Sequence, residues 1–448
     1  MDFYRTVFKI ALPIIMQNFL TSFVNMIDTV MVGQLGAVEI AAVGLGNQIF
    51  FVMNTVMFGV VSGGSIFMSQ FWGKKDISRL RQTMGITVAL AFAVSMLFTV
   101  LAAFFPEKCL SVYTNDVSVI LHGASYLRVV SPCYFFFGIS MAFGHALRST
   151  EHVNLPMAAT GISVLVNAIG NAAFIFGVSI GGTQIIPTMG IQGAAAATVF
   201  SRIVETVILT AVPVIKKYEI IGKLRGYLLT DFSFLGKYAR ICLPVLINES
   251  LWGFGISMQN SIFAHAGTDV IAAFNIRGTI DNLVWVFFIG TGNAAAILIG
   301  KKIGERNYDG ARLLANKMAR FMPCSAAVLA PLMIPLSFLL PYFFNVQPHI
   351  TRMAARMLYL VIFFYPFCAF NMCMIVGVCR SGGDTVFASF IDAGFMWLIA
   401  LPLGFIAVLV FHWPYWALFL CVHTEDILKA TAGFIRLKSG KWLHDLTE

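Results

Sequence analysis

Five carboxylic acids lie inside long apolar stretches of the sequence: Asp28, Glu205, Glu249, Asp281 and Asp392. A charged side chain at the middle of a membrane-spanning helix costs about 2.5–3.5 kcal/mol on insertion scales, so such acids are candidates for function. Arg202 precedes Glu205 by three residues and Arg277 precedes Asp281 by four, which places each pair on one helix face. These two acids are predicted to form local ion pairs, whereas Asp28 and Asp392 have no basic partner nearby in the sequence.

Asp28 lies in the segment SFVNMIDTVMVG and is predicted to be a cation-coupling site. Asn25 is three residues earlier, and Asn167 and Asn171 are four residues apart on another helix, so each pair shares a face. Thr198 lies in the small-residue segment GAAAATVF, which permits close helix packing. An acid among such oxygens can take up a proton or bind a sodium ion. The alternative is that these side chains only form hydrogen bonds between helices.

The candidates in the second half of the sequence are predicted to line a substrate cleft or to take part in coupling. Glu249 in LPVLINESLW is expected to face a substrate cleft and attract a cationic compound, or to take part in coupling; the alternative is a structural hydrogen bond. Asp281 and Asp392 are weaker candidates for the same roles, and Gln259 and Trp252 are named as cleft residues on the helix of Glu249.

Three ionisable residues near the end of the last apolar run are not expected to have a role inside the membrane. Glu425, Asp426 and Lys429 are predicted to face water.

The elements that must position these residues are long apolar helices. The chain has 448 residues, of which 58% are hydrophobic and 11% charged, against about 25% charged in soluble domains. A span needs roughly 20 mostly apolar residues. Twelve such runs are predicted, at about 8–32, 45–70, 84–105, 121–147, 155–177, 190–214, 238–263, 274–299, 314–341, 355–378, 385–411 and 414–434. The fold class is therefore an all-α polytopic membrane protein with twelve transmembrane helices.

The sequence repeats itself at an offset near 231 residues. LPIIMQN opens the first run and LPVLINE the seventh, and FWGKKD follows the second run as LIGKKIGERN follows the eighth. Because each half holds six runs, both halves enter the membrane from the same side, which makes a parallel repeat. We expect a six-helix lobe at 1–214, a connector at 215–237, a second lobe at 238–434 and a tail at 435–448.

Two such lobes can enclose a cleft and expose it to alternate sides of the membrane. Pro13, near the start of the first run, is a candidate helix bend, since proline removes an intrahelical hydrogen bond. The alternative is that Pro13 only marks the start of the helix.

The chain has a formal net charge of +9, and its basic residues are distributed as the predicted topology requires. Most basic residues, Arg148 and Arg380 among them, fall in segments that the positive-inside rule assigns to the cytoplasm together with both termini. A nucleic-acid binder would instead gather its charge on a polar face. The eight cysteines form no CxxC pair and are expected to be buried thiols, not metal ligands. We expect no enzyme, no cofactor and no nucleic-acid partner.

The motifs LPIIMQN, NMIDTVMVGQLG, FWGKKD, LRST and CRSGGDT, in this order over the whole chain, resemble the multidrug and toxic compound extrusion (MATE) family. The resemblance implies antiport of small amphipathic, often cationic compounds, driven by protons or sodium ions. It implies that Asp28, Asn167 and Thr198 form the cation site of the first lobe and that Pro13 is a bend. Asn171 stands where some members have a second acid, so the driving ion stays open.

In the second lobe, Asp384 in RSGGD resembles an acid implicated in some members of the family, and it is expected in a cytoplasmic turn. Glu249 lies a turn earlier than the acid of the sodium-linked branch.

The sequence predicts a monomer in the inner or plasma membrane of a bacterium, with the lipid bilayer and a small organic substrate as its partners. A lipid-linked oligosaccharide flippase of the same superfamily is the nearest alternative, and it would need a strongly cationic cleft. A membrane enzyme would need clusters of acids or histidines in sizeable loops, and the eight histidines are scattered.

Overall fold

The computed structural model describes residues 3–180, 183–228, 231–338, 340 and 346–448. Inside the helices and strands, the side chains of residues 25, 26, 29, 30, 37, 180 and 183 also lie outside the described part. The predicted site residue Asn25 is one of these, so its side chain is not placed.

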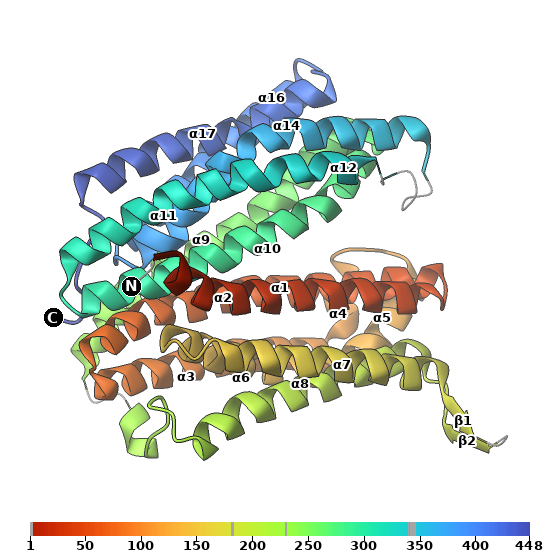
Figure 1. The fold of residues 1–448 in the computed structure, drawn as a ribbon. Coiled ribbons are helices and arrows are strands. Elements are labelled where there is room, and N and C mark those ends of the chain that lie inside the picture. Colours follow the sequence, from red (N-terminus) through yellow and green to blue (C-terminus); the bar gives the residue numbers. More distant parts are fainter. Residues whose placement is uncertain (1–2, 181–182, 229–230, 339, 341–345) are drawn as a thin grey trace. The chain divides into compact units, whose positions relative to one another are not determined.

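The first half of the sequence folds into long helices with one small hairpin (Figure 1). Its helices are α1 (Phe3–Gly33), α2 (Ala37–Lys74), α3 (Ile77–Phe104), α4 (Pro106–Ser111), α5 (Val117–Val130), α6 (Pro132–Ser149), α7 (Asn154–Phe176) and α8 (Gly190–Ile215). Strands β1 (Val178–Ile180) and β2 (Thr183–Ile186) pair antiparallel between α7 and α8. A short 3-10 helix, η1 (Leu224–Tyr227), lies in the predicted connector.

The second half is also helical and contains several π-helical turns. Its elements are α9 (Phe232–His265), α10 (Thr268–Gly304), α11 (Tyr308–Leu329), η2 (Ala330–Leu332), α12 (Met333–Ser337), α14 (Pro348–Met372), η3 (Cys373–Arg380), α15 (Thr385–Ser389), η4 (Phe390–Gly394), η5 (Met396–Ala400), α16 (Leu401–Leu409) and α17 (Tyr415–Ser439). The π-helices are η3, η4 and η5, and each continues a longer helical run.

The predicted all-α polytopic fold is confirmed. Ten helical runs in the described part are long and apolar enough to cross a bilayer. The pair α5 and α6 meets the same criterion together, with a bend of 50° at the break before Pro132. Helix α17 completes the predicted twelve. Hydropathy alone does not select it, because it carries acidic and basic residues along its length.

Helices α1 and α9 each contain the proline that the repeat places near their starts. Pro13 lies inside α1, which continues to Gly33, and Pro244 lies inside α9, which begins at Phe232. Neither proline stands at a helix start, so the alternative that they only mark the start of a helix does not explain them. A role for Pro13 in bending stays a prediction.

Matching turns in the two halves show the repeat at the level of backbone geometry. Lys75, after α2, and Arg306, after α10, both adopt left-handed conformations, with φ of 62° and 57°. The next residues, Asp76 and Asn307, cap the following helices by accepting a hydrogen bond from a backbone N–H three residues on. The same turn therefore recurs at the offset of the sequence repeat.

The described residues form two compact units. One holds the chain up to Ile15, Ser69–Lys75 and Gly236–Glu448, and the other holds Met16–Met68 and Asp76–Leu235. The first few turns of α1 and the end of α2 thus pack with the second sequence half. This grouping follows packing, not the repeat, and the predicted lobe boundaries stay a prediction.

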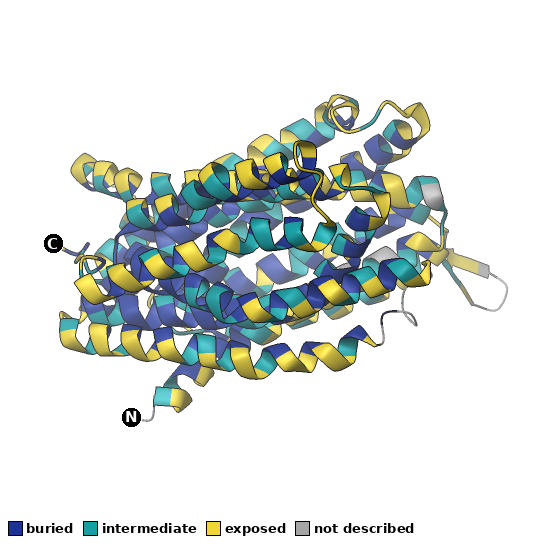
Figure 2. Cartoon of the chain, turned by 90° about the horizontal axis from the view of Figure 1, so that it is seen from above, coloured by how far each residue is buried: buried dark blue, intermediate teal, exposed yellow. Residues whose placement is uncertain are grey.

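Many of the exposed residues, which Figure 2 draws in yellow, are large and apolar. Leu97 is 56% exposed, Leu165 63% and Phe200 54%. Large apolar surfaces are costly in water but not against lipid tails. The exposure pattern therefore agrees with helices that are surrounded by a bilayer.

Candidate functional site

A cavity of about 440 Å³ lies within the unit formed mostly by the first sequence half. Its walls come from α1, α2, α5, α6, α7 and α8. The polar residues that line it include Asp28, Asn47, Asn54, Thr160, Ser163, Asn167, Thr198 and Arg202. The aromatic side chains are Phe50, Phe51, Tyr126 and Tyr134. The cavity thus combines one carboxylate with hydroxyls, amides and rings.

Asp28 joins a chain of hydrogen bonds that runs from α1 through α7 to α8. Asn171 Nδ2 donates to Asp28 Oδ1 at 2.5 Å and approaches Asn167 Oδ1 at 3.2 Å. Asn167 Nδ2 in turn donates to Thr198 Oγ1 at 3.4 Å. The structure therefore brings together Asp28, Asn167, Asn171 and Thr198, which the sequence grouped as one candidate site.

Small residues allow α7 and α8 to approach closely enough for this chain. A Cβ added to Gly170 would lie 3.0 Å from the Ala197 Cβ, and one added to Gly193 would lie 2.5 Å from the Phe174 carbonyl oxygen. Asn167 and Asn171 are one turn apart on α7 and are 3% and 1% exposed. Close packing thus holds both amides in buried positions.

The oxygen atoms around Asp28 are the ligand type that protons and hard cations select. Asn171 Oδ1 is buried and has no hydrogen-bond partner in the described part of the chain. A buried amide oxygen without a partner is costly, so such atoms call for an explanation. A bound cation or water beside Asp28 would supply the missing contact.

The basic side chain that lines this cavity is held by another acid. Arg202 Nη1 bonds to Glu205 Oε2 at 2.7 Å, which confirms the predicted local pair. The Glu205 Oε1 atom accepts a hydrogen bond from Thr160 at 2.8 Å, and Gln17 donates to Thr160 at 3.0 Å. Asp28 itself has a neutral amide as its hydrogen-bond partner. Its charge is therefore not cancelled by a direct ion pair among the described contacts.

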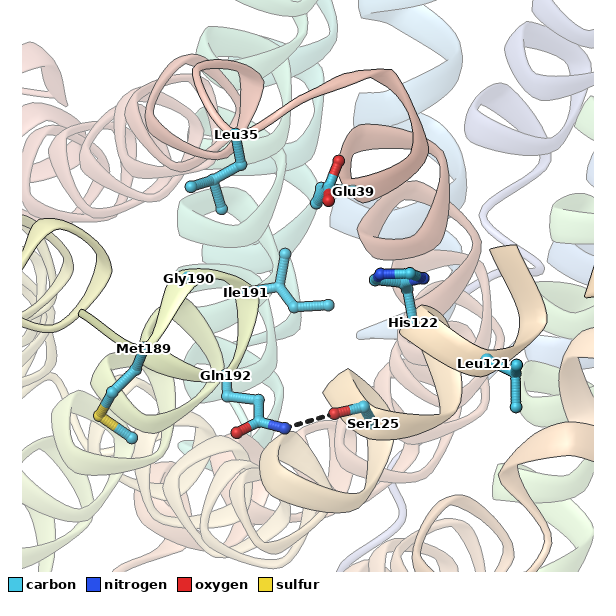
Figure 3. Close-up of a pocket in the computed structure, with 9 residues that line it drawn as sticks. All are labelled: Leu35, Glu39, Leu121, His122, Ser125, Met189, Gly190, Ile191 and Gln192. Carbon is cyan, nitrogen blue, oxygen red and sulfur yellow. Dashed lines mark hydrogen bonds between the residues drawn. The ribbon is translucent and has the colours of Figure 1, made fainter. Parts of the chain in front are cut away.

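An open groove of about 600 Å³ lies beside the cavity in the same unit (Figure 3). Glu39 and His122 line it, and Gln192 donates to Ser125 at 2.6 Å, the bond drawn as a dashed line in Figure 3. Leu35, which lines the groove, packs against an apolar cluster that includes Val32, Val43 and Ala194 of the cavity wall. An apolar layer thus separates the groove from the chamber of Asp28.

Two candidates of the second half, Glu249 and Asp392, belong to a separate buried charge cluster. Glu249 Oε1 bonds to Arg380 Nη2 at 2.5 Å, and the same guanidinium nitrogen lies 4.0 Å from Asp392. Asp392 also accepts from Asn248 at 2.9 Å and pairs with Lys429 at 3.3 Å. The sequence placed Glu249 and Asp392 as separate candidates, and the structure links them through Arg380.

The prediction that the acids and lysine of the last helix face water is wrong for Glu425 and Lys429. Each is 5% exposed, and they pair with each other at 3.1 Å. The physical reason is the length of α17, which continues to Ser439 and places these residues near its middle. Asp426 is partly shielded as well and pairs with His423 at 2.8 Å.

Two residues assigned to cytoplasmic turns are also buried. Arg380 is 2% exposed and Asp384, whose Oδ2 accepts from Arg436 Nε at 2.6 Å, is 7% exposed. Sequence reasoning missed the role of Arg380 because it counted all basic residues near run ends as loop residues. A signal was present in the repeat, since Arg380 matches Arg148, which also reaches into a helix bundle and donates to Gln17 at 2.9 Å.

Asp281 is held by local contacts, as its spacing predicted. It pairs with Arg277 at 2.9 Å and accepts a hydrogen bond from the Tyr365 hydroxyl. Gln259 and Trp252 lie on α9, where Trp252 is 36% exposed. Neither belongs to the charge cluster, and their predicted cleft role stays a prediction.

The MatE family model matches the chain twice, over residues 13–173 and 245–406. A "Probable multidrug resistance protein NorM" from Thermotoga maritima is 26% identical over 98% of this chain and 93% of its own length. A "Probable multidrug resistance protein YoeA" from Bacillus subtilis is 24% identical over 90% of this chain and 86% of its own length.

Among solved structures, an outward-facing multidrug resistance MATE family transporter of the MOP superfamily superposes with a TM-score of 0.87 at 17% identity, covering 98% of this chain and 97% of its own. A MATE transporter from Vibrio cholerae, VcmN, also superposes with a TM-score of 0.87 at 17% identity, covering 99% of this chain and 98% of its own. These likenesses establish a shared fold. The two family-model matches, which together cover more than half of the chain, show that it belongs to the MATE family of membrane transporters.

Proposed function

We propose that the chain is a cation-coupled antiporter that exports small amphipathic, often cationic organic compounds by alternating access. The observation that carries the proposal is the Asp28 carboxylate in the wall of a cavity that also offers aromatic rings. Relatives named as multidrug resistance proteins, such as NorM of Thermotoga maritima, support the substrate class.

Coupling would follow from competition inside one chamber. A proton or sodium ion that binds at Asp28 would use the carboxylate together with the amide oxygens of Asn167 and Asn171. An organic cation would pack on Phe50, Phe51 or Tyr126 and be attracted by the same carboxylate. Because one negative charge serves both ligands, each weakens the binding of the other, and inward ion movement can drive outward export.

The buried cluster of the second half is proposed as a further coupling group. Its acids are Glu249, Asp392 and Glu425, against the bases Arg380 and Lys429. Buried charges must be balanced, so an excess of acids favours uptake of a proton or cation. Asp281 has contacts that fit a structural role better, and the coupling role named for it rests on the sequence alone.

The flippase alternative receives no support from this chamber. Such a protein would need cationic side chains free to meet a pyrophosphate. Among the described residues that line the cavity, the basic one is Arg202, which is engaged by Glu205.

The proposed setting is the inner or plasma membrane of a bacterium, with both termini in the cytoplasm and the monomer as the working form. The distribution of basic residues supports this orientation.

Transport in proteoliposomes with imposed gradients tests the proposal. With ethidium as the probe, an inward-directed proton or sodium gradient should drive ethidium out of the compartment that faces the cytoplasmic side. Collapse of that gradient by the matching ionophore should stop it, and a potassium gradient of equal size serves as the control. Ethidium movement that is equally fast without any gradient, or that requires ATP, would refute cation-coupled antiport.

A further inference from the structure

The nine residues after α17 fold back onto the same unit as an ordered segment, here called the tail (residues 440–448). Trp442 is 1% exposed and Leu446 6%. Leu443 forms a β-bridge with Gly383, and the His444 N–H donates to the Gly382 carbonyl at 2.8 Å. The tail is therefore packed against the turn that follows η3.

Gln70 of α2 joins the tail to that turn. Its side-chain nitrogen donates to the carbonyl oxygens of Ser381 at 2.8 Å and His444 at 3.3 Å. Its side-chain oxygen accepts from the Leu446 N–H at 2.8 Å. Gln70 is 0% exposed, and its bonds with Ser381 and Leu446 are buried. One side chain of the first sequence half thus binds two segments of the second.

Further polar contacts surround this joint. Lys74 Nζ, also on α2, donates to the Thr447 carbonyl at 2.6 Å. Tyr308 at the start of α11 donates to Asp445 at 2.9 Å, and Arg306 pairs with Glu448 at 3.3 Å. The tail therefore bridges the end of α2 to the region where α10 gives way to α11.

The end of α2 also meets α10 directly through glycines of the repeated motifs. A Cβ added to Gly73 would lie 2.0 Å from the Lys301 carbonyl oxygen, and one added to Gly304 would lie 1.8 Å from that of Gln70. These two helices belong to different sequence halves, and their backbones touch. In any carrier that works by rocking one half against the other, this contact must open on this side of the membrane.

We propose that the tail is a latch that holds the end of α2 against α10 and the turn after η3. The Gln70 side chain fastens this latch through its three hydrogen bonds. The latch keeps the side assigned to the cytoplasm closed and must release before that side opens. The proposal rests on the alternating access proposed above.

The chemistry of the contacts suits a reversible closure. Arg306 and Glu448 are 62% and 65% exposed in their side chains, and such surface pairs add little stability. The remaining polar bonds are each worth a modest net free energy, and the apolar anchors are the two side chains Trp442 and Leu446. The tail can therefore detach without unfolding a helix.

A distance measurement tests the latch without substrate or gradient, so its outcome is independent of the transport assay. Spin labels are placed by Lys75→Cys and Glu305→Cys, both exposed positions beyond the contact, in a variant that lacks the native cysteines. Ending the chain at Ser439 should raise the ratio of long to short distances at least about tenfold, because the truncation removes several hydrogen bonds and a single net bond is worth up to about tenfold. A synthetic peptide of residues 440–448 should restore the short distance.

Two further variants keep the test decisive if the truncated protein folds poorly. Gln70→Leu removes the three hydrogen bonds of Gln70 and puts an apolar side chain of similar size in its place. It should also raise the ratio. Lys441→Ala changes an exposed tail residue and should leave the ratio unaltered. If neither the truncation nor Gln70→Leu shifts the ratio, or if both lower only the unfolding temperature, the tail is a structural brace and the latch proposal is overturned.

Discussion

The Asp28→Asn variant should be expressed and folded yet unable to drive ethidium export from an imposed proton or sodium gradient. Asparagine keeps the size of the side chain and can still form a hydrogen bond with Asn171. It cannot carry the negative charge that binds a proton or sodium ion. Export in proteoliposomes should therefore fall to the level of empty vesicles, while the thermal unfolding temperature in detergent stays close to that of the unmodified protein.

The matched control for this variant is Asp116→Asn, the same change at an exposed acid. Asp116 caps α5 by accepting hydrogen bonds from the Ser118 and Val119 N–H groups, and asparagine caps helices about as well. Its gradient-driven export should be unchanged. If Asp28→Asn exports ethidium as fast as Asp116→Asn does, the coupling ion does not act through Asp28.

The Arg380→Met variant should have the largest effect on stability. Arg380 is 2% exposed and its guanidinium contacts Glu249, with Asp392 4.0 Å away. Removing one partner of a buried pair costs about 3–5 kcal/mol, because the remaining charge is left without compensation. Thermal unfolding in detergent, followed by the fluorescence of a thiol-reactive dye at buried cysteines, should show a large downward shift.

Two controls separate this charge effect from a loss of packing. Adding Glu249→Gln to Arg380→Met removes the stranded charge and should recover most of the lost stability. Arg128→Met breaks an exposed pair with Glu107, whose side chains are 54% and 43% exposed, and should cost less than about 1 kcal/mol. Equal losses in Arg380→Met and Arg128→Met would mean that Arg380 does not compensate a buried acid in the second-half cluster.

The sequence could predict features that depend on local chemistry. Continuous apolar runs predicted the helices, and the i, i+4 spacing of Asn167 and Asn171 placed them on one face of α7. The isolated acid at position 28 had no basic neighbour in the sequence, and in the structure its hydrogen-bond partner is an amide. The pairs of Arg202 with Glu205 and Arg277 with Asp281 followed from spacing alone.

The predictions that failed concern contacts between segments that are distant in the sequence. Asp392 had no partner within its own helix, but Asn248 and Lys429 reach it from α9 and α17. Lys429 was assigned to water because α17 was predicted to end at 434, whereas it runs to Ser439. The packing of the tail was not predicted, because its apolar residues, Trp442 and Leu446, are too few to show a periodic pattern.

The most direct test of the central claim is the affinity of the purified protein for ethidium, measured in detergent across pH and sodium concentration. If ion and organic cation compete for Asp28, lowering the pH or raising sodium should weaken ethidium binding to the unmodified protein by up to about tenfold per tenfold change in the driving ion. The Asp28→Asn variant should bind ethidium with an affinity that does not respond to that ion. A variant that retains the full ion dependence would contradict the claim that Asp28 is where the two ligands exclude each other.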